Sequence, residues 1–369
     1  MRKIGREVLF MSANNESRRK GEGDFIRLKD GTIMHAYSEY LGADAFDDHH
    51  YSRVVAIFSH DEGETWGEHT SLIETEKEYM NTMSVSLLRF KNGDIGLFYC
   101  KKYMDEKGAM KVRIFVSRSK DECKTFGEPY MISEGEYMYS ANARAILTKA
   151  GRVILAVNCH KSEDGINVAF ASDSRFYLSD DDGYTFYDSG NIILGPYNNA
   201  GAGLQETGLV EIENGRILAY ARTTFGCQYI YHSDDGGLTW TEPRANSIFF
   251  SPGAPMLIRH VCKNKTLAVF NPIPNYPGRK DDQHEWSRRT PMIGMICDGE
   301  GENLLNGKNI PLVFEDDDWN SYCYPAIISG DDYFLIAYYH SNNTKLTLNS
   351  LKMIKVELKD IYPEEEKKD

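Results

Sequence analysis

The chain has 369 residues, of which 41% are hydrophobic and 12% aromatic, and its formal net charge is −13 at pH 7. This composition is sufficient for a large core, and a negative chain without a basic cluster is not expected to bind nucleic acid. No run approaches the ~18 apolar residues of a membrane span, and the N-terminal stretch lacks the ~7–15-residue apolar core of a secretory signal. We therefore expect a cytoplasmic protein that does not bind membranes, or a secreted one if a leader has been removed.

Short apolar strand patterns flank turn residues from one end of the chain to the other. These turns are Asp30-Gly31, Asn92-Gly93, Ala150-Gly151, Asn214-Gly215 and the weaker Asn264-Lys265 and Asp331-Asp332. Six turns correspond to roughly 60 residues per unit, which suits a four-stranded antiparallel sheet. The spacing predicts an all-β fold, a six-bladed β-propeller that forms a single domain over residues 1–369.

In chain order, the predicted blades span roughly residues 11–75, 76–135, 136–195, 196–248, 249–315 and 316–362. The clearest unit is residues 204–240, where strands at Leu209–Ile212 and Ile217–Arg222 flank Asn214-Gly215 and a third strand leads to the next turn. Because a propeller must close its ring, we expect Gly5–Phe10 to pair into the last blade.

A second turn motif, Ser-x-Asp-x-Gly-x-Thr-aromatic, occurs four times, starting at serines 60, 60 and 54 residues apart: Ser59, Ser119, Ser179 and Ser233. The Ser and Asp side chains are expected to bond the turn backbone, the glycine to take a positive φ, and the aromatic residue to pack between strands. Cys123 replaces the glycine in the second copy, so we expect some strain there. We interpret these turns as structural; calcium or ligand binding is the alternative.

Seven cysteines with scattered spacing favour reduced, mostly buried thiols over a disulfide framework. Metal catalysis has little support, because His49 and His50 are adjacent and point apart in an extended segment, and no Cys/His cluster has zinc-like spacing. The stretches GEGD and SPGAP lack the strand–helix context of a phosphate loop. No cofactor is therefore predicted, and no pattern indicates an oligomeric state.

Both kinds of turn fall at one end of the predicted blades, so the opposite face collects strand ends and connecting loops. Acids, arginines and tyrosines converge there: Glu22, Asp24, Asp47, Asp48, His49, His50, Asn81, Asn142, Arg144, His160, Glu206, Arg222, Arg289, Tyr322, Tyr324 and His340. Each alone has the alternative of a solvated loop charge. Together they predict a binding or catalytic site around the axis.

The four turns resemble the Asp-box of the sialidase superfamily, and the whole chain is similar to its bacterial BNR-repeat branch. By position, Tyr324 matches that family's nucleophile, Glu206 the glutamate that activates it, and Arg222 and Arg289 two of the three arginines that bind the substrate carboxylate. The resemblance implies an exo-acting glycoside hydrolase whose partner is a terminal glycoside or an oligosaccharide.

The chemistry of the family explains these residue types. Sialic acid carries a carboxylate on its anomeric carbon, so a neutral tyrosine activated by a glutamate is a better nucleophile than an anion. Arginines bind the carboxylate bidentately, and a partly shielded aspartate protonates the leaving oxygen. Asp47 matches this acid, with Asp44 and Asp48 as alternatives in the same loop. His49, Asn81 and Asn142 are predicted to contribute to substrate binding.

The family's first arginine opens the first strand within an Arg-Ile-Pro motif, and here the chain departs from the pattern. Counting back from Asp30-Gly31 places Gly21 and Glu22 at that position, and Arg18 and Arg19 are predicted to lie outside the strand.

Glu22 and Asp24 thus bring negative charge to the place where a sialic carboxylate would bind. Carboxylates suit the hydroxyls of another terminal sugar, and Arg144 is the candidate substitute cation. A non-catalytic carbohydrate-binding propeller is the alternative function, and a protein-interaction platform is a third hypothesis.

Overall fold

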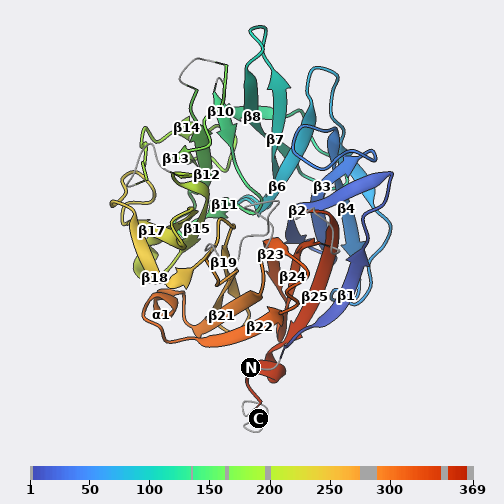
Figure 1. The fold of residues 1–369 in the computed structure, drawn as a ribbon. Helices are drawn as coiled ribbons and strands as arrows, with labels where there is room; N and C mark the ends of the chain where they lie inside the picture. The colour runs from blue at the N-terminus through green and yellow to red at the C-terminus, as the bar shows by residue number, and fades with distance from the viewer. Residues whose placement is uncertain are drawn as a thin grey trace.

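Antiparallel strands dominate the computed structural model, which describes residues 3–133, 136–162, 166–195, 201–274, 289–341 and 348–363. Five sheets surround a common centre (Figure 1). Four of them have four strands and one has nine. The chain is therefore all-β, as predicted, and no described helix is long and apolar enough to cross a membrane.

The first two sheets contain β2 to β14. One comprises β2 (Ser17–Arg27), β3 (Ile33–Leu41), β4 (Ser52–Ser59) and β5 (Thr70–Ile73). The nine-stranded sheet comprises β6 (Asn81–Arg89), β7 (Ile95–Met104), β8 (Met110–Ser119), β9 (Tyr130–Ser133), β10 (Tyr137–Tyr139), β11 (Ala145–Leu147), β12 (Val153–His160), β13 (Ser172–Ser179) and β14 (Tyr187–Asp188). Here β10 bridges β6–β9 and β11–β14, because it pairs with both β8 and β12.

The remaining sheets follow the same antiparallel order. One comprises β15 (Gln205–Glu211), β16 (Ile217–Arg222), β17 (Cys227–Ser233) and β18 (Arg244–Phe250), with a 3₁₀ turn at Glu213–Gly215. Another comprises β19 (Leu257–Val261), β20 (Lys265–Phe270), β21 (Met292–Asp298) and β22 (Ile310–Glu315). The last comprises β23 (Tyr322–Ser329), β24 (Tyr333–His340), β25 (Ser350–Glu357) and β1 (Arg6–Met11), so the N-terminal strand pairs with β25. The helices are single turns, α1 (Glu302–Leu305) and α2 (Leu358–Ile361).

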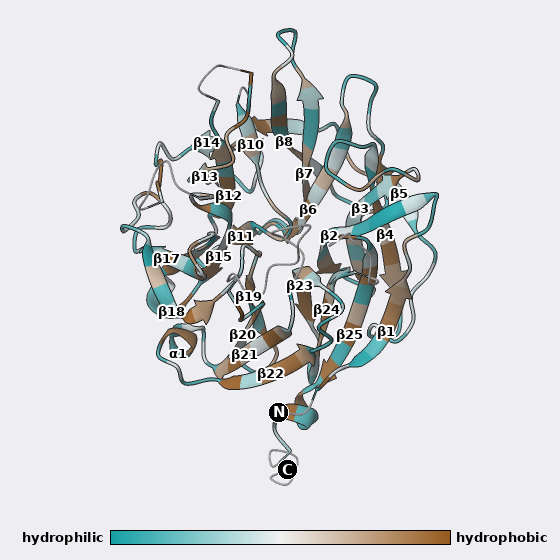
Figure 2. Ribbon diagram, viewed as in Figure 1, coloured by the Kyte–Doolittle hydropathy of each residue, from teal (hydrophilic) through white to brown (hydrophobic). Residues whose placement is uncertain are grey.

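The cores lie between neighbouring sheets, where the apolar side chains of facing strands meet. Figure 2 shows hydrophobic residues, in brown, along the strands. Between the first and last sheets, for example, Phe25, Ile33 and Val55 pack with Leu335 and Met353. Each sheet is thus buried on both faces, which explains the long apolar runs in its middle strands. All seven cysteines are free thiols and six of them are buried.

The four Asp-box turns form the side-chain bonds that the sequence predicts. In the first, Asp61 accepts hydrogen bonds from Ser59 Oγ at 2.8 Å and from Thr65 N and Oγ1 at 2.9 and 2.6 Å. Cys123 takes a φ of 63°, which is the strained conformation expected where it replaces glycine. The residue before it, Glu122, accepts a hydrogen bond from Lys29 N of the neighbouring sheet at 2.9 Å. The boxes therefore fasten each hairpin and also tie adjacent sheets together.

Trp240→Ala should lower the free energy of unfolding by about 2–3 kcal/mol, below the ~3–5 of a fully buried aromatic residue, because the indole is only partly buried. It stacks on Phe176 at 4.1 Å between ring centroids. Urea unfolding measures the change, and Leu238→Ala in the same turn, where the side chain is 44% exposed, is the control. Trp66→Ala should behave like Trp240→Ala. Unchanged stability with lost ligand binding would instead give the boxes a functional role.

Candidate functional site

One backbone feature recurs at the site end of the innermost strands. Five residues that are not glycine take φ values from 48° to 61° within or just before the innermost strands β2, β6, β11, β15 and β23: Glu22, Ser84, Ala143, Glu206 and Tyr324. In four of them the strand register shifts at that point. Such a conformation costs on the order of 1–3 kcal/mol for each such residue, so its recurrence marks a constraint worth relating to function.

Glu206 is the centre of the site. Its Oε1 accepts a hydrogen bond from Tyr324 Oη at 2.5 Å, and its Oε2 accepts one from Arg222 Nη1 at 2.9 Å. Arg289 lies with its guanidinium carbon 5.6 Å from the Tyr324 ring centroid, and its Nη1 contacts Cys323 Sγ at 3.1 Å. Glu206, Arg222, Arg289 and Tyr324 are all at most 8% exposed, so the structure brings together four residues predicted from separate strands.

Opposite effects act on the two proton-carrying groups. Burial raises the pKa of Tyr324 well above its ordinary value, and the Glu206 carboxylate raises it further. Burial also favours a higher pKa for Glu206, but Arg222 and the Tyr324 hydroxyl outweigh this effect and the net pKa is lowered. The arrangement therefore places a neutral phenol against an ionised carboxylate.

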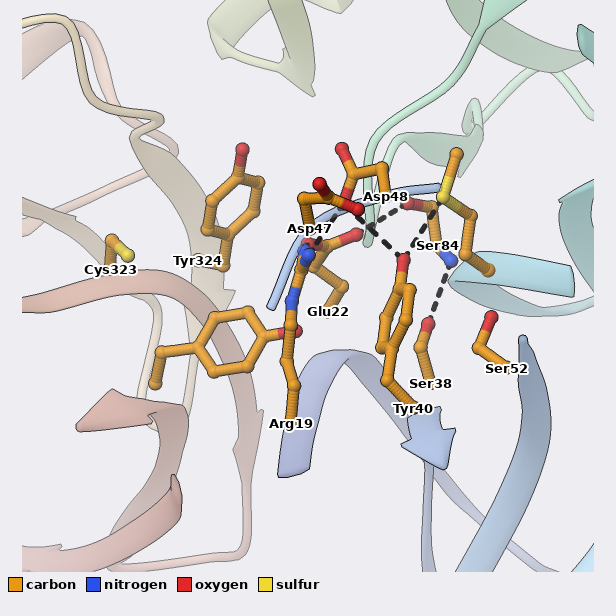
Figure 3. Close-up of polar contacts among 12 residues, drawn as sticks. Arg19, Glu22, Ser38, Tyr40, Asp47, Asp48, Ser52, Ser84, Cys323 and Tyr324 are labelled. Atoms are coloured by element: carbon orange, nitrogen blue, oxygen red, sulfur yellow. Dashed lines mark hydrogen bonds and ion pairs between the residues drawn. The ribbon is translucent and has the colours of Figure 1, made fainter. Parts of the chain in front are cut away.

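Arg19 belongs to the site, although the sequence predicts that it lies outside the strand. Strand β2 begins at Ser17, and two register shifts change which of its side chains face inward. The buried guanidinium binds Glu22, contacts Asp48 Oδ1 at 2.5 Å and donates from Nε to Tyr339 Oη at 2.8 Å (Figure 3). The prediction failed because a bulge cannot be counted from the downstream turn.

Glu22 lies where the sequence places it, but one of its carboxylate oxygens binds Arg19. The other carboxylate oxygen of Glu22 accepts a hydrogen bond from Ser84 Oγ at 2.7 Å. Burial raises the pKa of Glu22, and Arg19 opposes that rise. Arg19 is thereby shared between two carboxylates and a phenol, so its charge is largely compensated within the protein.

The 42–51 loop places its two central aspartates differently. Asp48 reaches Arg19, and its backbone oxygen accepts hydrogen bonds from Asn81 Nδ2 at 2.6 Å and Lys102 Nζ at 2.8 Å. Burial favours a higher pKa for Asp48, but Arg19 and Lys102 outweigh it, so the pKa is lowered. Asn81 thus supports the loop. Asp47 has a side chain that is 57% exposed and lies 2.8 Å from His50 Nδ1.

His49 is exposed on the same loop and donates its backbone N–H to Asp47 Oδ1 at 2.8 Å. Asp44 is exposed as well. In the part of the chain that the structure describes, no group of three or more His, Cys, Asp or Glu side chains is arranged to hold a metal ion.

Three further predicted residues bond the backbone of the strands around the axis. Asn142 Nδ2 donates to Gly23 O at 2.9 Å and to Pro325 O at 3.2 Å. Arg144 donates from Nε to Glu206 O and from Nη2 to Met256 O, at 3.1 Å each. The Asp24 carboxylate accepts hydrogen bonds from Phe25 N at 2.9 Å and Leu87 N at 3.0 Å. These bonds join innermost strands of different sheets. They give Asn142, Arg144 and Asp24 a structural role, and the predicted contact with substrate stays a prediction.

Asp24→Asn should flatten the pH dependence of stability between about pH 4 and pH 6. Burial raises the pKa of Asp24 from 3.8 to about 6, so the folded protein holds this proton more tightly than the unfolded chain. The stabilisation is complete below pH 4 and is lost as the pH rises through 6, by up to about 3 kcal/mol for two pKa units. Urea unfolding of both proteins from pH 4 to pH 7 measures it, and parallel curves would contradict it.

Comparison with known proteins agrees with this geometry. The family model for a BNR repeat-like domain matches residues 31–336. A protein of unknown function from Dyadobacter fermentans superposes with a TM-score of 0.73 at 19% identity, over 95% of this chain and 99% of that one. No curated protein matches the chain.

Solved sialidases have the same fold. The K499G mutant of NanB sialidase from Streptococcus pneumoniae superposes with a TM-score of 0.70 at 11% identity, over 97% of this chain and 71% of that one. The intramolecular trans-sialidase from Ruminococcus gnavus gives 0.70 at 14% identity, over 96% and 97%. Because the family model matches residues 31–336, which is most of the chain, the chain belongs to the BNR repeat-like domain family, and it has the fold of the solved sialidases.

Proposed function

We propose that the protein is an exo-acting glycosidase in which Tyr324 is the nucleophile and Glu206 its activating base. The hydrogen bond from Tyr324 Oη to Glu206 Oε1 carries this proposal, because it joins a neutral phenol to an ionised carboxylate inside a buried site. A base within hydrogen-bond reach of a hydroxyl is the arrangement that activates a nucleophile.

In the proposed reaction, the Tyr324 oxygen attacks the anomeric carbon and its proton passes to Glu206. The bond to the leaving oxygen breaks, and that oxygen takes a proton from the 42–51 loop. Asp47 is the candidate donor and Asp44 the alternative, because Arg19 and Lys102 keep Asp48 ionised. Water then attacks the anomeric carbon and gives a proton to the loop aspartate. The bond from that carbon to the Tyr324 oxygen breaks, Glu206 returns its proton to Tyr324, and the sugar is released.

Charge suggests which terminal sugar binds. Arg222 binds Glu206, and Arg289 lies beside the Tyr324 ring, so two arginines border the site where a polar or anionic group of the substrate would lie. Glu22 lies at the position that the resemblance gives to the family's first arginine, and Arg19 is already bound by Glu22 and Asp48. We infer a substrate that differs from ordinary sialosides at the group facing Glu22.

We further infer a single domain with six blades. The support is that β6–β9 and β11–β14 are separate four-stranded units within the nine-stranded sheet, and that six apolar clusters join neighbouring units, including the first to the last. A closed ring of this kind brings the innermost strands to one axis, where Glu206 meets Tyr324.

A panel of aryl glycosides, sialyl and non-sialyl, tests the proposed function. Purified protein is expected to release the aryl alcohol from at least one of them. If no glycoside is cleaved while sugars still bind, the protein is a carbohydrate-binding protein and the proposed activity is wrong.

Tyr324→Phe should reduce turnover by several orders of magnitude and leave ligand affinity nearly unchanged, because only the attacking oxygen is removed. Tyr322→Phe is the matched control, since that ring packs in the apolar cluster between the last two sheets. Steady-state kinetics and calorimetric binding measure both variants. Near-normal turnover by Tyr324→Phe would exclude Tyr324 as the nucleophile.

Standard sialosides should be cleaved weakly or not at all. Loss of one charge-assisted hydrogen bond to the carboxylate, ~1.5–3 kcal/mol, corresponds to about one to two decades of affinity before any repulsion by Glu22. Glu22→Gln should improve sialoside binding because it removes that repulsion, whereas Asp24→Asn should not, since backbone N–H groups bind its carboxylate. Efficient sialoside cleavage by the unmodified protein would refute this prediction.

A further inference from the structure

Trp319 is the most exposed of the described large apolar side chains, with 77% of its surface accessible against 51% for Phe250, the next. It lies in the loop of residues 316–321, between β22 and the strand that carries Tyr324. Leaving the apolar area of an indole in water costs free energy. Exposed aromatic residues are therefore typical of binding surfaces.

Hydrogen bonds fix the loop backbone that carries this indole. Asp317 Oδ1 accepts the backbone N–H of Trp319 at 2.9 Å, and Oδ2 accepts Asn320 Nδ2 at 2.7 Å. Thr290 Oγ1 donates to the backbone oxygen of Asp317 at 3.1 Å. A side chain presented by such an ordered loop loses less conformational entropy when a ligand covers it.

The same loop borders the candidate active site. Arg289 N donates to Ser321 Oγ at 3.1 Å, and Tyr322 N donates to Arg289 O at 2.9 Å. The loop is therefore attached to the backbone of Arg289, whose guanidinium lies beside the Tyr324 ring. Trp319 is three residues from Tyr322 and five from Tyr324 in the chain, and hydrogen bonds from Thr290 to Asp317 and from Arg289 to Ser321 join its loop to the Arg289 side of the site.

We propose that Trp319 forms a subsite for the leaving group, in which the C–H face of a neutral hexose stacks on the indole. This inference rests on the proposed function, because a terminal sugar held at Tyr324 directs the rest of the glycan outward over the rim. An amphipathic sugar ring suits an indole, which offers an apolar face of large area.

The neighbouring charges support a neutral ligand. Asp316, Asp317 and Asp318 are all exposed beside the indole, and the chain as a whole carries a net charge of −13. Carboxylates accept hydrogen bonds from sugar hydroxyls, whereas an anionic leaving group would be repelled. The proposed substrate is thus an oligosaccharide whose second residue is an uncharged hexose.

The kinetic test compares two substrates with the same terminal sugar, a glycosyl fluoride and an oligosaccharide with a neutral hexose as leaving group. Trp319→Ala should lower kcat/KM for the oligosaccharide by about tenfold and leave the fluoride unchanged, because fluoride is too small to reach the indole. Phe250→Ala, on the outer strand β18, should change neither value. Equal losses on both substrates, or no loss on either, would overturn the proposal.

A binding test gives a readout without turnover. In the full-length Tyr324→Phe protein, lactose, cellobiose and maltose are titrated while intrinsic tryptophan fluorescence is recorded. At least one should change the signal, and adding Trp319→Ala should abolish that change while Phe250→Ala preserves it. A signal that survives Trp319→Ala, or no response to any of the three, would refute the subsite.

Sedimentation of the unmodified protein and the Trp319→Ala variant tests the alternative that Trp319 contacts a second copy of the chain. A self-associated protein that becomes monomeric in the variant would assign Trp319 to contact with a second copy and overturn the sugar subsite. If Tyr324→Phe keeps its turnover but disaccharides still bind at Trp319, the proposed nucleophile is wrong and the subsite stands.

Discussion

The buried carboxylate of Glu206 is the constraint on which the site depends. Removing a carboxylate from water costs several kcal/mol unless its oxygens are paired, and here one oxygen binds Arg222 and the other binds Tyr324. Arg222 comes from the neighbouring strand, but Tyr324 lies in a different sheet and 118 residues further along the chain. The pairing therefore exists only when the sheets have assembled around their centre, and the site is a product of the whole fold.

The same backbone conformation delivers different side chains to that centre. Glu22, Ser84, Ala143, Glu206 and Tyr324 all take positive φ values, and consecutive members are 62, 59, 63 and 118 residues apart. Each bulge turns one side chain out of the regular alternation. Because the backbone repeats, the chemistry is determined by which residue occupies each equivalent position. Carboxylates occupy two of the five positions, a hydroxyl one and a phenol one.

The strands and turns could be predicted because short sequence patterns specify them. The polar contacts of the site could not be predicted in this way. An Asp-box is specified within eight residues, so its hydrogen bonds follow from the sequence. Arg19 was missed because two register shifts separate it from the turn used for counting. Arg144 and Asp24 were placed on the correct face, but their backbone partners lie in other sheets and no sequence pattern encodes them. The bulge spacing is the signal by which Glu22 and Ser84 could have been grouped with Glu206.

The position of Glu22 connects fold and specificity. Its backbone takes the same positive φ as the equivalent residues of other sheets, whereas the side chains at these positions differ. The buried carboxylate of Glu22 needs partners, and Arg19 and Ser84 supply them. The same Arg19 guanidinium also binds Asp48. The loop that carries Asp47 and Asp48 is thereby tied to Glu22, which we infer stands in place of the sialidase family's first arginine. A substitution at Glu22 should therefore alter both the charge in the site and the contact that anchors the 42–51 loop. We expect substrate preference and loop anchoring to vary together.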